Sequence, residues 1–166
     1  KAALDAGAHI VNDVSAGESD SEMFNLVAES EAGYILMHMQ GSPETMQDAP
    51  IYSEVLTVVK EYFMERLQVA GQAGIDIKQI VLDPGIGFGK TLSDNLRLMG
   101  NIGSIGNLMR PLLLGASRKS FIGMIDNSAV DKRIGGSLAA VLSAYQQGVR
   151  LFRVHDVSET RQVLDI

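Results

Sequence analysis

The sequence predicts an α/β fold built from parallel βα units, either a (β/α)8 barrel or an open α/β sheet. Short apolar segments of strand type alternate with segments of helical periodicity, and the strands recur roughly 25 to 45 residues apart. Each strand segment also ends in polar residues that can bind or react. The carboxyl ends of the strands form the active face in such folds, so this placement predicts a functional site.

Length, composition and charge narrow the class of protein. At 166 residues with 46% hydrophobic content, residues 1–166 are expected to form one domain or part of one. No apolar run reaches membrane-spanning length, and the first residues lack the anatomy of a signal peptide. The lack of cysteine excludes disulfides and thiolate metal sites and fits a cytoplasmic protein. A formal charge of −6 argues against nucleic acid as the main partner.

The first part of the chain contains two predicted strands with a helix between them. Residues 9–14 (HIVNDV) form a short apolar run, and residues 34–39 (YILMHM) form a second that includes His38. Residues 21–32 carry apolar side chains at helical spacing, and Gly33 is expected to end that helix.

A polar loop over residues 41–50 precedes a long helix over 53–73, for which Ser53 and Glu54 are suitable starting residues. The buried stripe of this helix is expected to consist of Val55, Val58, Val59, Tyr62, Phe63, Leu67 and Ala70.

The segment Ile80–Lys90 (IVLDPGIGFGK) is the centre of the predicted site. Residues 80–82 form an apolar strand buried on both faces, and Pro84 and Gly85 end it. Asp83 therefore lies at the carboxyl end of a buried strand, where it could bind a ligand. A structural alternative stays open, in which Asp83 caps the turn and the glycines only shape it.

The glycines of this segment match no nucleotide-binding motif. A phosphate-cradling loop requires glycine where Pro84 stands, and the dinucleotide fingerprint requires glycine where Lys90 stands. The loop is therefore expected to approach a different kind of ligand, or simply to turn.

The second half continues the same alternation. We expect a weaker helix over 94–99, a strand over 111–116, a long connection over 121–133, a small-residue helix over 136–145, a strand over 151–154 and a last helix from Ser158. The polar residues at the ends of the five predicted strands are Asn12 and Asp13, His38, Asp83, Arg118 and Lys119, and Arg153 and His155. Taken alone, Arg118 and Lys119 could also be a solvated basic pair.

Five motifs follow one another along the chain: NDVSAG at 12–17, MHMQGSP at 37–43, LDPGIGFGK at 82–90, GASRKSFIG at 115–123 and RVHDV at 153–157. Together they closely resemble the dihydropteroate synthase family. The resemblance implies a (β/α)8 barrel and an enzyme of folate synthesis that is a sulfonamide target. Such a transferase joins 4-aminobenzoate to a dihydropterin methyl pyrophosphate.

The resemblance also implies roles for particular residues. Asn12 and Asp83 would bind the pterin ring, Met37 would be its apolar wall, and Lys119 would meet its carbonyl and a ring nitrogen. Lys119 and Asp83 are thus the candidate catalytic residues. By pattern alone, an ordinary core methionine is the favoured interpretation of Met37.

The aminobenzoate would lie between Phe88, against its ring, and Ser120, near its carboxylate. Gly115 joins the implied substrate-binding residues through its place in the fourth motif.

Arg153 and His155 are expected to bind the pyrophosphate. They alternate along a strand, so both should face one side while Val154 faces the other. Arginine offers a planar fork for phosphate oxygens, and histidine adds a second donor. The alternative is a salt bridge from Arg153 to a carboxylate such as Asp156, with His155 only packing.

The chain departs from the family in its extent. A closed barrel takes about 250 residues, so five strands in 166 residues cannot close one. The resemblance implies that these are the fourth to eighth strands. It places the family's Mg²⁺ ligand and a third-strand aspartate outside this chain, and it implies a homodimer for the full-length form. Residues 1–166 alone are therefore expected to be inactive.

Three alternatives remain open. A pterin-dependent methyltransferase domain would share the barrel and the Asn/Asp grip, but it should lack the SRKS and RVHDV pair because it binds no pyrophosphate. A metal-dependent hydrolase would use His38, His155 and Asp83, although no His-x-His pair lies on a strand. An incomplete barrel could instead be a non-catalytic binding or assembly module.

Overall fold

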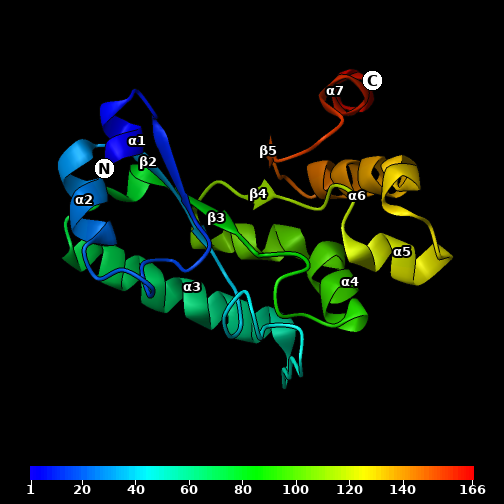
Figure 1. The fold of residues 1–166 in the computed structure, drawn as a ribbon, viewed down its shortest axis with the longest axis horizontal. Helices are drawn as coiled ribbons and strands as arrows, with labels where there is room; N and C mark the ends of the chain where they lie inside the picture. The colour runs from blue at the N-terminus through cyan, green and yellow to red at the C-terminus, as the bar shows by residue number, and fades with distance from the viewer.

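A computed structural model describes residues 1–166 and contains five short parallel strands (Figure 1). The strands are β1 (Ile10–Asp13), β2 (Gly33–Met37), β3 (Ile80–Asp83), β4 (Leu113–Leu114) and β5 (Leu151–Phe152). β1, β2 and β3 form one sheet and β4 and β5 form another. A parallel bridge between Leu82 and Leu112 joins the two sheets. The strands therefore neighbour one another in chain order, and the prediction of parallel βα units is confirmed.

The central strand differs from the two outer ones. β3 pairs with β2 on one side, with Met37 opposite Asp83, and its other side bonds residues just before β4. β1 and β5 each have one neighbour only, and Ile10 and Leu151 at these edges are 58% and 41% exposed. These five strands are thus an open arc with two free edges rather than a closed barrel.

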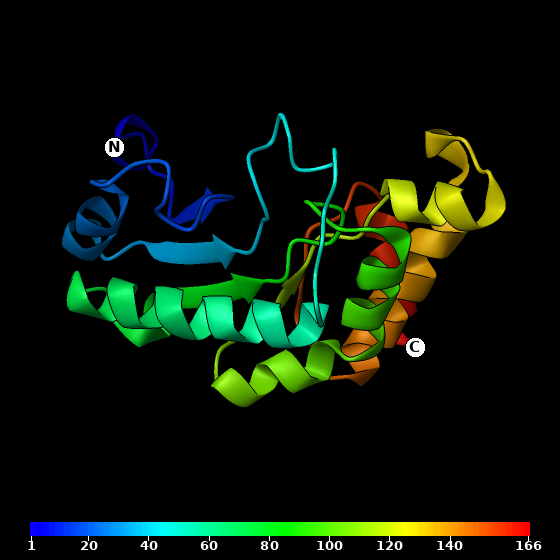
Figure 2. The ribbon, with the colours of Figure 1, turned by 90° about the horizontal axis from the view of Figure 1, so that it is seen from below.

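Seven α-helices pack along the arc (Figure 2). They are α1 (Ala2–Asp5), α2 (Met23–Ser30), α3 (Val55–Gln72), α4 (Leu92–Gly100), α5 (Ser120–Asp126), α6 (Ile134–Gln146) and α7 (Val157–Asp165), with 3-10 turns at Ile77–Gln79, Ile102–Leu108 and Val130–Lys132. The long helix α3 lies beside the first sheet (Figure 2), and its Val59 and Phe63 are completely buried in the core that also contains Leu36 and Leu82.

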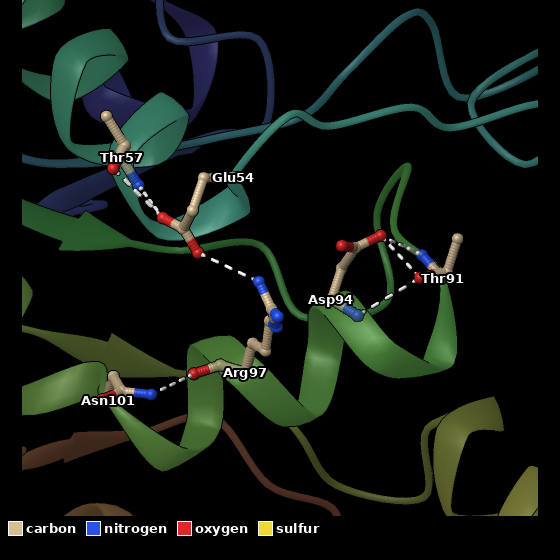
Figure 3. Close-up of polar contacts among 6 residues, drawn as sticks. All are labelled: Glu54, Thr57, Thr91, Asp94, Arg97 and Asn101. Atoms are coloured by element: carbon tan, nitrogen blue, oxygen red, sulfur yellow. Dashed lines mark hydrogen bonds and ion pairs between the residues drawn. The ribbon is translucent and has the colours of Figure 1, made fainter.

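Side-chain caps start α3 and α4 (Figure 3). The Glu54 carboxylate accepts a hydrogen bond from the Thr57 backbone N–H at 2.8 Å. Thr91 and Asp94 cap each other at the start of α4, because Asp94 Oδ2 accepts from the Thr91 N–H while the Thr91 hydroxyl accepts from the Asp94 N–H. Arg97 of α4 contacts Glu54 at 3.5 Å, so the first turn of α3 also contacts α4.

Three sequence predictions need correction. The helix predicted over 21–32 ends at Ser30, because Glu31 rather than Gly33 takes the left-handed conformation. The strands predicted over 111–116 and 151–154 shrink to two residues each. The connection predicted over 121–133 contains α5, whose Phe121 and Ile122 are buried.

The packing of α5 explains why it forms. Ile122 lies against α6 at Gly136, where an added Cβ would be 2.5 Å from its side chain, so the small residues of α6 admit α5 at close range. This tertiary contact stabilises a helix that is too short to be stable alone.

No helix in the structure has both the length and the apolar character required to span a membrane.

Candidate active site

Asp83 lies at the carboxyl end of β3 and is only 1% exposed. Its Oδ1 accepts a hydrogen bond from the Gly85 N–H at 2.8 Å, and its Oδ2 accepts from Arg153 at 3.0 Å. Arg153 also donates to Asn12 Oδ1 at 2.8 Å. The ends of β1, β3 and β5 therefore bring together three of the predicted site residues.

Burial shifts the pKa of the Asp83 carboxyl group. Burial raises its pKa, and the Gly85 N–H and the Arg153 guanidinium only partly oppose that effect. A buried carboxylate is stabilised in its charged form by hydrogen-bond donors. A ligand with adjacent N–H groups could therefore replace Arg153 as the donor to Asp83.

A cavity of about 260 Å³ opens at Arg153, whose guanidinium links it to Asp83. Its lining consists of Phe88, Gly115, Ser117, Lys119, Arg153, Val154 and His155. Lys119 Nζ lies 4.1 Å from the centroid of the Phe88 ring, a cation–π contact across the cavity. Arg153 crosses directly over Gly115, where an added Cβ would be 2.6 Å from its Nη2.

The predicted basic pair, Arg118 and Lys119, separates at the end of β4. Arg118 has a left-handed backbone conformation (φ 55°) and pairs with Asp156, outside the set of residues that line the cavity. Lys119 points into the cavity, where burial and then the Arg153 charge lower its pKa while Asp83 opposes them. Lys119 and Arg153 thus give the cavity two cationic side chains beside a single buried carboxyl group.

His155 lines the same cavity as Arg153, and Ser117 holds it in place. The Ser117 hydroxyl is 3.0 Å from His155 Nδ1 and accepts a hydrogen bond from the His155 backbone N–H at 3.2 Å. Strand alternation does not explain this arrangement, because β5 ends at Phe152 and Val154 lines the cavity too. Arg153 does form a salt bridge with a carboxylate, as the alternative expected, but its partner is Asp83, because Asp156 pairs with Arg118.

Two other predicted residues lie apart from the cavity lining. Met37 is completely buried at the end of β2, opposite Asp83. Ser120 is exposed as the first residue of α5. The structure therefore puts Met37 next to the Asp83 strand end, whereas Ser120 lies outside the cavity lining, directly after Lys119.

Asp13 and His38, at the ends of β1 and β2, bond other groups of the protein and lie outside the cavity lining. Asp13 accepts hydrogen bonds from the Tyr34 hydroxyl at 2.6 Å and from Ser15 and Gly17. Burial alone would raise the Asp13 pKa, but these bonds together lower it. Asp13 thus fixes the turn that follows β1, and His38 at the end of β2 contacts the side chain of Lys90.

Sequence reasoning missed two residues of this region. Ser117 orients His155, and Lys90 is buried beneath the loop that follows Asp83. The Ser-Arg-Lys-Ser run at 117–120 could have indicated Ser117. Nothing in the sequence distinguished Lys90 from an exposed lysine.

The residues of this chain do not fit a metal site by themselves. No group of three or more histidine, cysteine, aspartate or glutamate side chains is close enough to hold a metal ion. The hydrolase alternative fails on the same geometry, since His38 bonds Lys90 while His155 bonds Ser117.

The chain matches known proteins over nearly all of its length. Residues 1–155 match the family model described as pterin binding enzyme. The chain is 45% identical to the dihydropteroate synthase of Escherichia coli K12 over 96% of its own length and 56% of the relative's. It is also 38% identical to that of Synechocystis, over 99% and 57%. It thus spans little more than half of these curated relatives.

Solved structures give the same picture. The chain superposes with a TM-score of 0.92 and 41% identity on the dihydropteroate synthase of Thermus thermophilus in complex with 6HMPPP, and it covers 64% of that protein. The Xanthomonas albilineans enzyme in complex with 7,8-dihydropteroate matches with a TM-score of 0.91 and 38% identity, over 60% of its length.

Proposed function

The chain belongs to the pterin binding enzyme family, and on that premise we propose that it is the part of a dihydropteroate synthase that holds both substrates. In this reaction the amine nitrogen of 4-aminobenzoate attacks the methylene carbon of a dihydropterin methyl diphosphate. The carbon–oxygen bond breaks, diphosphate leaves with the electron pair, and the nitrogen loses a proton. The product is 7,8-dihydropteroate in folate synthesis.

The observation that carries this proposal is the buried carboxyl group of Asp83, which bonds Arg153 in the lining of a cationic cavity. The amino-pyrimidine edge of a pterin has adjacent N–H donors, which suit an acceptor held at this depth. Asn12 bonds the same Arg153 side chain as Asp83 does, and Met37 lies opposite Asp83 on the neighbouring strand β2. We assign these three residues to the pterin ring.

Lys119, Arg153 and His155 are assigned to the oxygens around the reacting carbon. Lys119 would meet the pterin carbonyl and a ring nitrogen, while Arg153 and His155 would hold the diphosphate as its charge grows in the transition state. A pterin-dependent methyltransferase has no diphosphate to bind, so the gathering of these three side chains in one cavity supports the synthase.

The aminobenzoate is assigned to the face of the cavity formed by Phe88. Its ring would pack on Phe88, and its carboxylate would lie toward Ser120 and Gly115. Orienting the amine toward the methylene carbon is the main task of this face, because no covalent nucleophile is required.

The remaining strands of the barrel would come from outside these residues. We assign β1 to β5 to the fourth to eighth strands of a pterin-binding (β/α)8 barrel, with residues 1–166 as one partial domain. The two free edges in the arc and the coverage of the relatives support this assignment.

Magnesium, a homodimeric full-length form and a cytoplasmic location remain proposals that rest on the family. Because residues 1–166 form no metal-binding cluster, the roles assigned above involve only side chains of this chain and the two substrates. Sedimentation of the complete protein would decide the oligomeric state.

The direct test is turnover. The complete protein is expected to release diphosphate and form dihydropteroate from the two substrates, whereas Asp83→Asn in that protein should lose most of this activity. Residues 1–166 alone should form no product, because the arc leaves two unpaired edges. Absence of turnover from the complete protein would refute the proposed function, whereas turnover by residues 1–166 alone would refute the need for further strands.

A further inference from the structure

The side-chain amine of Lys90 is buried under the loop that follows β3. Lys90 is only 3% exposed. Its Nζ lies 2.9 Å from His38 Nδ1, 2.9 Å from the Phe88 carbonyl oxygen and 3.0 Å from the Gly85 carbonyl oxygen, with the His38 carbonyl oxygen further away at 3.3 Å. An ammonium group has three N–H donors, and the three nearest acceptors use all of them.

These acceptors belong to two different parts of the chain. His38 follows β2, whereas Gly85 and Phe88 lie in the loop after β3. The two segments touch backbone to backbone, because an added Cβ on Gly85 would collide with the His38 carbonyl oxygen. Lys90 therefore connects the carbonyl oxygens of Gly85 and Phe88, both in the loop, to His38 at the end of β2.

The position of this contact bears on the cavity. Phe88 contributes its carbonyl oxygen to the Lys90 clamp and its ring to the cavity, where Lys119 lies 4.1 Å from the ring centroid. Because Lys90 holds the Phe88 backbone, it also fixes the point from which the Phe88 ring enters the cavity. Gly87 at the tip is held separately, since its N–H donates to Asn95 Oδ1 at 2.7 Å.

A buried lysine is a costly way to close a loop. Burial lowers the pKa of Lys90 to about 7, and no carboxylate is in ion-pair contact with it. A methionine would fill the same space without the cost of burying a charge, but it could donate to none of the three acceptors. The distinctive contribution of Lys90 is thus geometrical.

We propose that Lys90 is a positioning residue that holds the loop Gly85–Gly89 against His38, so that Phe88 stays in place as the wall of the aminobenzoate site. Lys90 itself touches no substrate. The identity of the ligand at Phe88 rests on the proposed function, whereas the clamp on the loop does not.

The test uses the complete protein with Lys90→Met, and Lys132→Met as the matched control. Lys132 is an exposed lysine whose side chain is 75% accessible and pairs only with neighbouring Asp131. The KM for each substrate, kcat and hydrogen exchange of peptides that span 85–90 are measured at a temperature where circular dichroism shows every variant folded.

Lys90→Met is expected to raise the KM for 4-aminobenzoate by about tenfold or more, because a loosened wall misplaces the nucleophile. The KM for the pterin diphosphate should change by less than about threefold, since Asp83 remains in place. Exchange in the loop should become faster, and Lys132→Met should match the parent in every measurement. Equal rises in both KM values, or unchanged loop exchange, would overturn the proposal.

A double-mutant comparison tests whether Lys90 acts through Phe88. In a protein that already carries Phe88→Ala, adding Lys90→Met should change the aminobenzoate KM by less than about twofold, because the wall is already gone. If Lys90→Met raised the aminobenzoate KM by the same factor with and without Phe88→Ala, the proposal would be contradicted.

Two further outcomes are decisive. If Lys90→Met does not fold, Lys90→Gln, which retains two N–H donors, is measured by the same criteria. If neither variant folds, Lys90 is a residue of the fold and the proposal is wrong. If the parent protein fails to condense the two substrates, the proposed function fails, but the exchange data still decide whether Lys90 holds the loop.

Discussion

The carboxyl ends of β3 and β5 both supply residues to the site, but they are built very differently. β3 has hydrogen-bonded neighbours on both sides, and Asp83 at its end and Gly85 in the loop that follows are buried. β5 has two residues and one neighbour, and the Arg153 side chain beyond it is 43% exposed. Arg153 rests on Asp83 and Asn12.

This contrast separates two ways of presenting a functional group. The end of β3 is fixed by the fold, so its carboxyl group is in position before a ligand arrives. Beyond β5 the backbone bonds Leu114 and Ser117, but the Arg153 side chain is held only by Asp83 and Asn12, so under the proposed function a diphosphate would take the place of these partners. The following predictions probe the β3 end, the β5 end and the helix that follows the β3 loop.

The largest effect is expected from Gly85→Ala. Gly85 has φ +66°, and an added Cβ would collide with the His38 backbone, which cannot move aside. We expect a loss of more than about 3 kcal/mol in unfolding free energy, because strain and a buried clash add. Gly148→Ala is the control, since φ is +96° there but nothing lies within 4 Å; it should cost only about 1 kcal/mol. Equal costs in chemical denaturation would show that the β3 loop is not tightly packed.

At the β5 end, Arg153→Ala should raise the KM for the pterin diphosphate by roughly tenfold or more while leaving binding of the unphosphorylated pterin nearly intact. Steady-state kinetics and calorimetry measure the two quantities. Arg150→Ala serves as control, because its guanidinium bonds the carbonyls of Tyr145 and Val149 and lies outside the cavity lining. If both pterins lose affinity equally, Arg153 supports the fold instead.

Protonation offers a smaller signal from the same cavity. Burial and the Arg153 charge lower the pKa of Lys119, and an incoming diphosphate would raise it again. Binding of the pterin diphosphate at alkaline pH should therefore take up protons, which appears as a dependence of binding enthalpy on the ionisation enthalpy of the buffer. Lys119→Met should reduce the uptake, and an unchanged value would exclude Lys119 as its source.

The smallest effect concerns the helix that follows the β3 loop. Thr91→Ala removes the cap of α4 and should lower the unfolding free energy by about 1 kcal/mol. Ser93→Ala, an exposed position in the same helix, should be nearly neutral. Thermal denaturation compares them, and a neutral Thr91→Ala would mean that tertiary packing alone fixes α4.

The sequence predicted the fold correctly where short-range patterns, such as apolar runs and turn residues, determine the structure. Parallel βα units, the start of α3 at Glu54 and the place of Asp83 all followed from apolar runs and turn residues. The short strands and α5 did not, because tertiary packing decides them: β5 ends after two residues, and Ile122 of α5 packs on α6.

The site shows the same division. The ends of the strands indicated which residues could gather, and Asn12, Asp83 and Arg153 do so. Which cation meets which carboxylate depends on long-range geometry. A left-handed turn at Arg118 sends that side chain to Asp156 and leaves Asp83 to Arg153, a distinction that no local pattern contains.

The proposed function depends most on Asp83, whose carboxyl group is expected to accept hydrogen bonds from the pterin ring. Calorimetry on the complete protein with Asp83→Asn tests it most directly, with Asp156→Asn as a control at a carboxylate that pairs with Arg118 instead of the cavity residue Arg153. Loss of a charge-assisted acceptor should weaken pterin binding by about 1.5–3 kcal/mol and affect 4-aminobenzoate much less. Equal losses for both ligands would contradict the claim and leave Asp83 as a structural cap of the Gly85 turn.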